Sequence, residues 1–140
     1  MNLKQKISKP SASYSTMLSV DRALHEFRRG RIVHITDGSG GVLAITPEMV
    51  SDQTLSMISA LSDTHLDIAI THHRARTLKV RLYTDEVVLI PFKFWKTPEM
   101  ARVISDPIAD MAYPLSGPFI AKREPISPSS VAAIQLAKIA

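Results

Sequence analysis

The sequence predicts an α/β (α+β) domain in which a mixed β-sheet is covered by helices. Three observations favour this class. Segment 19–46 has the order helix, stop, strand, tight turn, strand. The rest of the chain alternates helix-start signals with short β-branched runs, as expected for helices interleaved with strands. The 140 residues, 45% of them hydrophobic and 21% charged, suffice for a single domain with its own core.

The first helix is expected to begin at Ser19, whose hydroxyl can accept a backbone N–H at a helix N-terminus. Arg28 and Arg29 suit the negative end of the helix dipole, and Gly30 supplies a left-handed residue that ends the helix. The apolar face of this helix has helical spacing and consists of Val20, Ala23, Leu24 and Phe27.

A β-hairpin is predicted next. The apolar runs 32–35 and 42–45 are the two strands, and the turn between them is Asp37–Gly41, with the sequence DGSGG. Asp-Gly favours hairpin geometry, so Asp37 is expected to have a structural role in the turn. The glycines do not form a phosphate-binding loop, because no Lys-Ser/Thr pair follows and a strand comes next.

The middle of the chain contains two further helix-start signals. Thr46-Pro47-Glu48 combines a capping hydroxyl, a proline and an acid, although Ser51 or Asp52 is an alternative start for the longer helix that ends at 62–64. A short strand, 66–70, follows with Asp67 as its one charge. Thr71 is predicted to cap one or two helical turns after that strand.

The second half of the chain contains more proline than the first half. Short strands are expected at 80–83 and at 86–92, the latter being the most β-branched run in the chain. Thr97-Pro98-Glu99 starts a helix that ends at 106–107. Proline and glycine argue against a long helix in 107–128 and leave at most a short strand at 119–121.

Ser127 is predicted to cap the last helix, whose residues 131–140 are apolar nearly all round. Such a helix is normally buried on more than one side. Its uncapped end favours the hypothesis that the chain is truncated before a following domain. The alternative is a terminal helix packed into its own core. Residues 1–17 are predicted to be a flexible basic leader, with the folded domain at 18–140.

Composition limits the function classes. The absence of cysteine excludes disulfides, thiolate zinc ligands and thiol nucleophiles. No apolar run approaches the ~20 residues that span a bilayer, and no cleavable signal pattern is present, so we expect no membrane association and a cytoplasmic location. The net charge of +4 is spread along the chain without a dense basic stripe interleaved with aromatics, which argues against nucleic-acid binding.

One cluster of residues is a candidate anion site. His72, His73, Arg74 and Arg76 follow directly after a predicted strand, where open α/β sheets often bind ligands. The alternative is a solvated basic turn. Adjacent histidines on a helix cannot easily share a metal, and no metal site or cofactor is predicted. Trp95 is interpreted as the core-facing end of a strand, with an exposed recognition patch as the alternative.

The order of these motifs resembles 3,4-dihydroxy-2-butanone 4-phosphate synthase, an enzyme family of riboflavin biosynthesis. That family has a helix ending in R-x-G, a T-P-E helix start, a strand running into T-x-x-R-A and a late A-A-x-x-L-A helix. The resemblance implies the fold of that family. The matching residues are Arg28-Arg29-Gly30, Thr46-Pro47-Glu48, Ala69-Ile70-Thr71 with Arg74-Ala75, and Ala132-Ala133 with Leu136-Ala137.

The departures from the family imply that its chemistry is lost. An acidic loop in the family holds magnesium and the acid/base carboxylates that act on ribulose 5-phosphate. Here the short turn at Asp37 stands in its place, and Asp37 is the one remnant carboxylate. One carboxylate supplies neither the ligands of a pair of hard cations nor both an acid and a base. No catalytic residue is therefore predicted.

Three hypotheses follow from the resemblance and the residues. The first is a non-catalytic structural or dimerisation domain, as found N-terminal to GTP cyclohydrolase II in some bacterial riboflavin biosynthesis proteins, acting as a homodimer. The second is a sugar-phosphate lyase of the same ancestry with a relocated site around Asp37, Arg74 and Arg76. The third is a basic nucleotide- or RNA-binding module.

Overall fold

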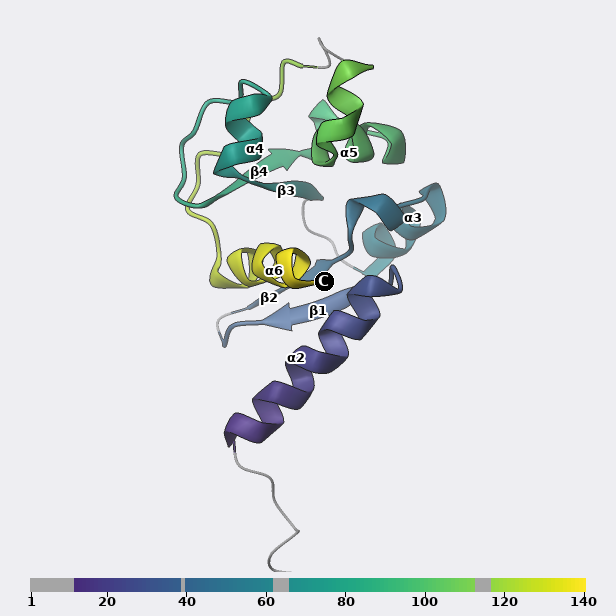
Figure 1. Ribbon diagram of the computed structural model, residues 1–140, viewed down its shortest axis with the longest axis vertical. Helices are drawn as coiled ribbons and strands as arrows, with labels where there is room; N and C mark the ends of the chain where they lie inside the picture. The colour runs from purple at the N-terminus through teal and green to yellow at the C-terminus, as the bar shows by residue number, and fades with distance from the viewer. Residues whose placement is uncertain (1–11, 39, 62–65, 113–116) are drawn as a thin grey trace, which may run out of the picture.

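The computed structural model describes residues 12–38, 40–61, 66–112 and 117–140 and is α+β (Figure 1). Its helices and strands, in chain order, are α2 (Ala12–Arg28), β1 (Val33–Thr36), β2 (Gly41–Ala44), α3 (Asp52–Leu61), β3 (Asp67–Thr71), α4 (His72–Thr77), β4 (Val87–Pro91), α5 (Pro98–Ser105) and α6 (Pro128–Ile139). Short 3₁₀ turns lie at Pro47–Met49, Phe92–Phe94 and Pro107–Met111.

The strands form two separate antiparallel pairs, so the prediction of one mixed sheet is wrong. β1 pairs with β2, placing Val33 opposite Ala44, and β3 pairs with β4, placing Asp67 opposite Pro91. The tight turn after β1 permits only an antiparallel partner. Between β3 and β4 the chain passes through the six-residue α4 and an irregular segment, and β4 then runs antiparallel to β3.

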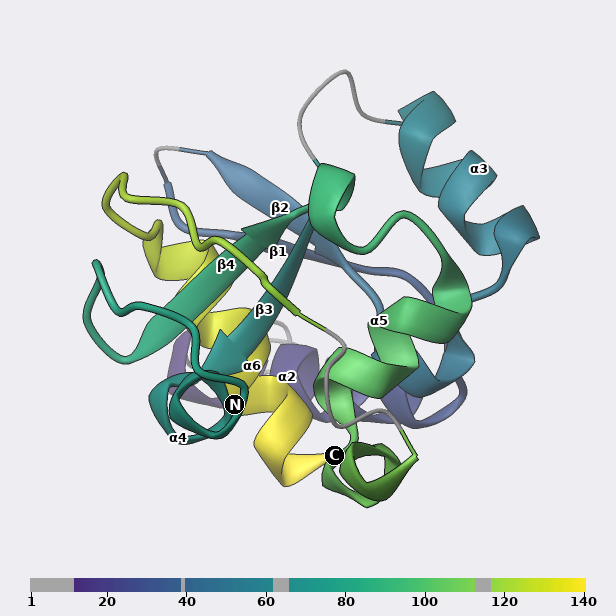
Figure 2. The same cartoon turned by 90° about the horizontal axis from the view of Figure 1, so that it is seen from above.

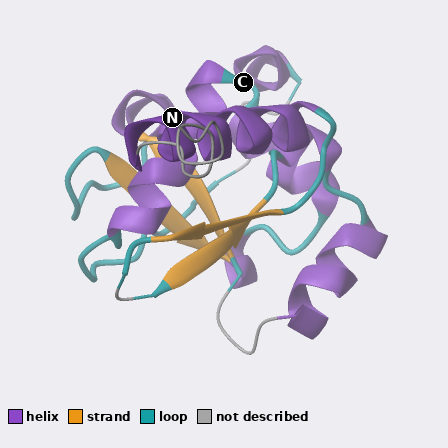
Figure 3. Ribbon diagram, turned by 90° about the horizontal axis from the view of Figure 1, so that it is seen from below, coloured by secondary structure: helices purple, strands orange, loops and turns teal. Residues whose placement is uncertain are grey.

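Helices surround the two pairs of strands on several sides (Figure 3). The β3–β4 pair lies with α4 and α5, while the β1–β2 pair lies next to α2 (Figure 1). The last helix, α6, contacts α2 and strands of both pairs, and it therefore connects the two halves of the domain. Helix α3 lies at the periphery (Figure 2).

Two hydrophobic clusters match these two halves. The larger cluster has one face of the β3–β4 pair at its centre, with Trp95 and α5 packed against that face. Trp95 is 5% exposed and its indole N–H donates to the Ile90 carbonyl at 3.1 Å, which confirms the core interpretation. The smaller cluster joins Phe27, Val33 and Leu136 from α2, β1 and α6.

Helix α2 begins at Ala12, so the prediction of an N-cap at Ser19 is wrong and the helix includes the end of the predicted leader. Residues 12–18 contain neither glycine nor proline, and the helix passes through them without a break. The Ser19 hydroxyl donates to the Ser15 carbonyl within the helix. The predicted stop is confirmed, because Gly30 has a φ of +73° and its N–H donates to the Phe27 carbonyl.

The other helix starts follow local side-chain chemistry. Thr71, Thr97 and Ser127 each accept a backbone N–H three residues later, as predicted. Thr46 makes no such cap, and only a 3₁₀ turn follows it. The alternative start is correct, since the Ser51 hydroxyl accepts the Thr54 N–H ahead of the first turns of α3. The predicted helix end at 62–64 lies outside the described residues.

Two predicted strands are absent from the described structure. Residues 80–83 follow α4 in an irregular segment, in which the Val80 N–H donates to the Ala75 carbonyl. Residues 119–121 also form no strand, and the next residue donates one hydrogen bond from Lys122 N–H to the Leu89 carbonyl. One such bond is not a ladder, so these apolar residues are buried without joining a sheet.

The helix stop at Gly30 predicts a difference between two glycine substitutions. A Cβ at Gly30 would lie 2.6 Å from Met49 Cγ, whereas Gly38, with a φ of +86°, has open space. Gly38→Ala should therefore cost only the left-handed strain of about 1–2 kcal/mol. Gly30→Ala should cost about 1–3 kcal/mol more, because Met49 must move. Urea unfolding of both variants measures this, and equal losses would contradict the close approach.

Candidate functional site

The hairpin turn places Asp37 against the start of α6. Its Oδ1 accepts the Gly40 N–H at 3.0 Å, which closes the turn. Its Oδ2 accepts both the Ser129 hydroxyl at 2.7 Å and the Ser129 N–H at 3.2 Å. Ser129 is 1% exposed and lies in the first turn of α6, where free N–H groups and the helix dipole favour a negative charge.

This geometry gives Asp37 the structural role predicted for it. Both oxygens are engaged with the protein, and the bonds to Ser129 join positions 92 residues apart in the chain. The carboxylate thereby fixes α6 to the β1–β2 hairpin. A general base needs a free oxygen directed at its substrate, which this arrangement does not offer.

Arg74, the centre of the predicted anion site, points into the protein. Arg74 is 7% exposed, and its guanidinium donates to the carbonyls of Val103 at 3.1 Å and Ile104 at 2.7 Å, at the C-terminal end of α5. It also forms a bidentate pair with Asp110, with N–O distances of 2.7 and 2.8 Å. Carbonyls in the last turn of a helix lack intrahelical partners, and a cation suits that end of the dipole.

The four residues of the predicted anion site are thus divided. His72 is half-buried, and its Nε2 lies 2.6 Å from the Thr84 carbonyl oxygen, which ties α4 to the following loop. His73 and Arg76 are exposed. The cluster therefore does not converge on one surface point. Among residues 12–38, 40–61, 66–112 and 117–140, no three or more His, Cys, Asp or Glu side chains are grouped as a metal site.

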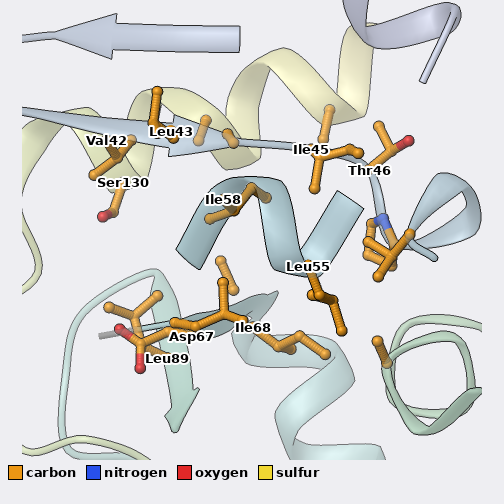
Figure 4. A pocket seen from close by; sticks show the side chains of 18 of the residues that line it. Val42, Leu43, Ile45, Thr46, Leu55, Ile58, Asp67, Ile68, Leu89 and Ser130 are labelled. Atoms are coloured by element: carbon orange, nitrogen blue, oxygen red, sulfur yellow. The ribbon is translucent and has the colours of Figure 1, made fainter. Parts of the chain in front are cut away.

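A cavity of about 560 Å³ lies between the two pairs of strands (Figure 4). Its walls come from β2, β3, β4, α3 and α6, with Val42 and Leu43 on one side and Ile68 and Leu89 on the other. The polar residues along its lining are few, and one of them is Asp67. Its size lies in the range of small-molecule pockets, about 300–1,000 Å³.

Asp67 is the residue that sequence reasoning did not select. Its Oδ2 accepts from Lys122 Nζ at 2.8 Å, while its Oδ1 is buried and has no hydrogen-bond partner among the described residues. The available signal was a lone charge in the apolar strand 66–70. Buried acceptors are nearly always paired, so this oxygen is an unusual feature of β3.

Comparisons with protein-family models, with curated proteins and with solved structures found no match to this chain. Within the described residues, no helix combines the length and hydropathy that a bilayer crossing requires. The resemblance to the butanone phosphate synthases therefore remains a prediction from the sequence.

The Asp37–Ser129 contact predicts coupled losses of stability. Asp37→Ala removes an interaction that closes the turn and holds α6, and it should lower the free energy of unfolding by about 1–3 kcal/mol. A double-mutant cycle with Ser129→Ala should give a coupling of about 1 kcal/mol. Glu124→Ala, at an exposed position, should stay within about 0.5 kcal/mol of the wild type. Strictly additive losses would show that the two side chains do not interact.

The Arg74–Asp110 pair predicts a pH dependence. The hydrogen bond from Arg74, aided by its charge, holds the pKa of Asp110 below its ordinary value of about 3.9. The pair therefore stabilises the fold fully above about pH 5 and loses this contribution as the pH falls through the lowered pKa. Asp110→Asn should flatten the acid limb of the unfolding free energy, whereas Asp85→Asn, at an exposed loop position, should not. An unchanged acid limb in Asp110→Asn would contradict the pair's role.

Proposed function

We propose that this chain is a non-catalytic interaction domain with the framework of a 3,4-dihydroxy-2-butanone 4-phosphate synthase, serving as a dimerisation unit in a riboflavin-biosynthesis polypeptide that carries GTP cyclohydrolase II. The observation that carries the non-catalytic part is the use of Asp37. The family resemblance leaves this one carboxylate of the acidic loop, and both of its oxygens bond to Gly40 and Ser129.

The reaction of that family requires more than one such group. Enolisation of a sugar phosphate needs a base that removes a proton and an acid that returns it, and magnesium needs several oxygen ligands. The carboxylate of Asp37 accepts hydrogen bonds from the hairpin turn and from the start of α6. Freeing it for chemistry would release the contact that fixes this helix.

The alternative of a relocated sugar-phosphate site has less support. It needs Arg74 and Arg76 to meet a phosphate together with Asp37. The guanidinium of Arg74 is instead buried against the end of α5 and paired with Asp110, while Arg76 is exposed. A phosphate would have to displace Asp110 and three backbone carbonyls to reach Arg74.

The dimerisation role draws on the first turns of α2. This helix projects beyond the two pairs of strands (Figure 1). Met17 and Val20 continue the helical face that packs through Leu24 and Phe27 farther along, yet Met17 is 66% and Val20 44% exposed. Tyr14, also exposed, lies one turn before them. An apolar face that extends past its own core fits association with a second copy.

A direct assay tests the loss of chemistry. The purified chain with magnesium should leave ribulose 5-phosphate unchanged, because no acid/base pair is free to act on it. The inert result should persist over the pH range in which the chain stays folded. Magnesium-dependent consumption of ribulose 5-phosphate that Asp37→Asn abolishes would overturn the proposal and support the lyase alternative.

Light scattering tests the dimerisation role. We expect a dimer at about 100 µM, where a complex of micromolar dissociation constant is largely assembled. Met17→Asp should yield a monomer, because it places a charge within the contact. Ser15→Asp adds the same charge on the other side of α2 and should remain dimeric. A monomeric wild-type chain, or equal behaviour of the two variants, would contradict this use of α2.

A further inference from the structure

The cavity between the two pairs of strands is only half enclosed, and α3 forms part of its wall. The apolar side chains that α3 contributes to the lining are those of Leu55, Ile58 and Leu61. Figure 4 shows Leu55 and Ile58 on the helix between the wall that carries Leu43 and the wall that carries Leu89. Helix α3 therefore covers apolar side chains of β2 and β4 that would meet solvent without it.

Few side chains hold α3 in this place. Ile58 is the one residue of the helix that is buried, at 7% exposure. Leu55 is half-buried against the larger hydrophobic cluster, whereas Met57 is 49% and Leu61 66% exposed. A helix of ten residues is marginal in water without tertiary contacts. The position of α3 over the cavity therefore depends mainly on Ile58.

The chain before and after α3 is held more firmly. Val50, two residues before the helix, is 5% exposed, and its carbonyl accepts from the Arg102 guanidinium at 2.6 Å. Beyond the helix, the Leu66 carbonyl accepts the Phe92 N–H at 3.0 Å at the start of β3. These bonds do not involve α3 itself, so the helix can leave its place while α5 and β3 keep theirs.

We propose that α3 is a lid that opens as a unit next to Val50 and uncovers the apolar cavity while the rest of the domain stays folded. In the closed state Ile58 lies in the cavity wall, and in the open state Leu43 and Leu89 of the facing walls meet solvent. Moving lids are drawn from elements of low local stability. The lid goes beyond the proposed interaction role and does not depend on it, because the proposed dimer contact lies on α2.

Amide hydrogen exchange tests the opening in the wild-type chain. The N–H groups of residues 56–61 bond within α3, so their exchange reports on its opening. After correction for intrinsic rates, they should exchange at least about 100-fold faster than the slowest amides of β3 and β4, with protection uniform within about tenfold. Protection equal to that of β3 and β4 would show that α3 opens only when the domain unfolds. A steady decline of protection toward Leu61 would show fraying instead of a lid.

Thiol labelling tests the exposure of position 58. The chain contains no cysteine, so a single introduced thiol reports on one position. Ile58→Cys should react with Ellman's reagent at least about 100-fold faster than Ile90→Cys, the same change at a fully buried position of β4. It should react at least about tenfold more slowly than Met57→Cys on the exposed side of α3. Equal rates at positions 58 and 90 would exclude a separate opening of α3, and equal rates at positions 57 and 58 would exclude a closed state.

Two alanine variants test what keeps the lid closed. Ile58→Ala removes the buried contact and should speed the exchange of residues 56–61 at least about 30-fold, while β3 and β4 remain protected. It should also raise the fluorescence of 1-anilinonaphthalene-8-sulfonate, a dye that binds exposed apolar surface. Met57→Ala, on the exposed side, should change neither reading by more than about twofold. Loss of protection throughout the chain, or an unchanged dye signal in Ile58→Ala, would overturn the proposal.

Discussion

The β3–β4 half of the domain depends on the hydrogen bonds of one buried group, the guanidinium of Arg74. It lies in α4, directly after β3, and reaches the last carbonyls of α5 and the carboxylate of Asp110 about 30 residues farther along. Helix ends leave backbone groups without partners, and burying such an end without a donor is costly. One side chain therefore joins α4, the end of α5 and the turn that contains Asp110.

The β1–β2 half uses the opposite arrangement. Asp37 brings a negative charge to the positive end of α6, as Arg74 brings a positive charge to the negative end of α5. Asp37 is an acid in a glycine-rich turn, and Arg74 is an arginine that follows a strand. Residues of both kinds are typical candidates for catalytic or ligand-binding sites. In each case, backbone groups at a helix end form hydrogen bonds with the side chain. Both charges therefore stabilise the packing of a helix end.

The separation of the two pairs of strands leaves a pocket between them. Both pairs contact α6, but they do not form one continuous sheet. The pocket between them is lined by small residues such as Ala69 and Ala133 as well as by larger apolar ones. Asp67 also lines it, with one oxygen bound to Lys122 and the other without a partner among the described residues.

The sequence by itself determined the features that depend only on residues close together in the chain. Gly30 ends α2, Asp37 and Gly38 turn the hairpin, and Thr71, Thr97 and Ser127 cap their helices, because each effect acts within a few residues.

Only the tertiary structure decided the rest. Separate antiparallel pairs replaced the expected mixed sheet, Arg74 turned inward, and Asp67 came to line a cavity. The last two outcomes depend on partners far along the chain, as in the bonds from Arg74 to Ile104, 30 residues away, and from Lys122 to Asp67, 55 residues away. A local pattern shows that a charge is present, whereas packing determines which distant backbone end or carboxylate it meets.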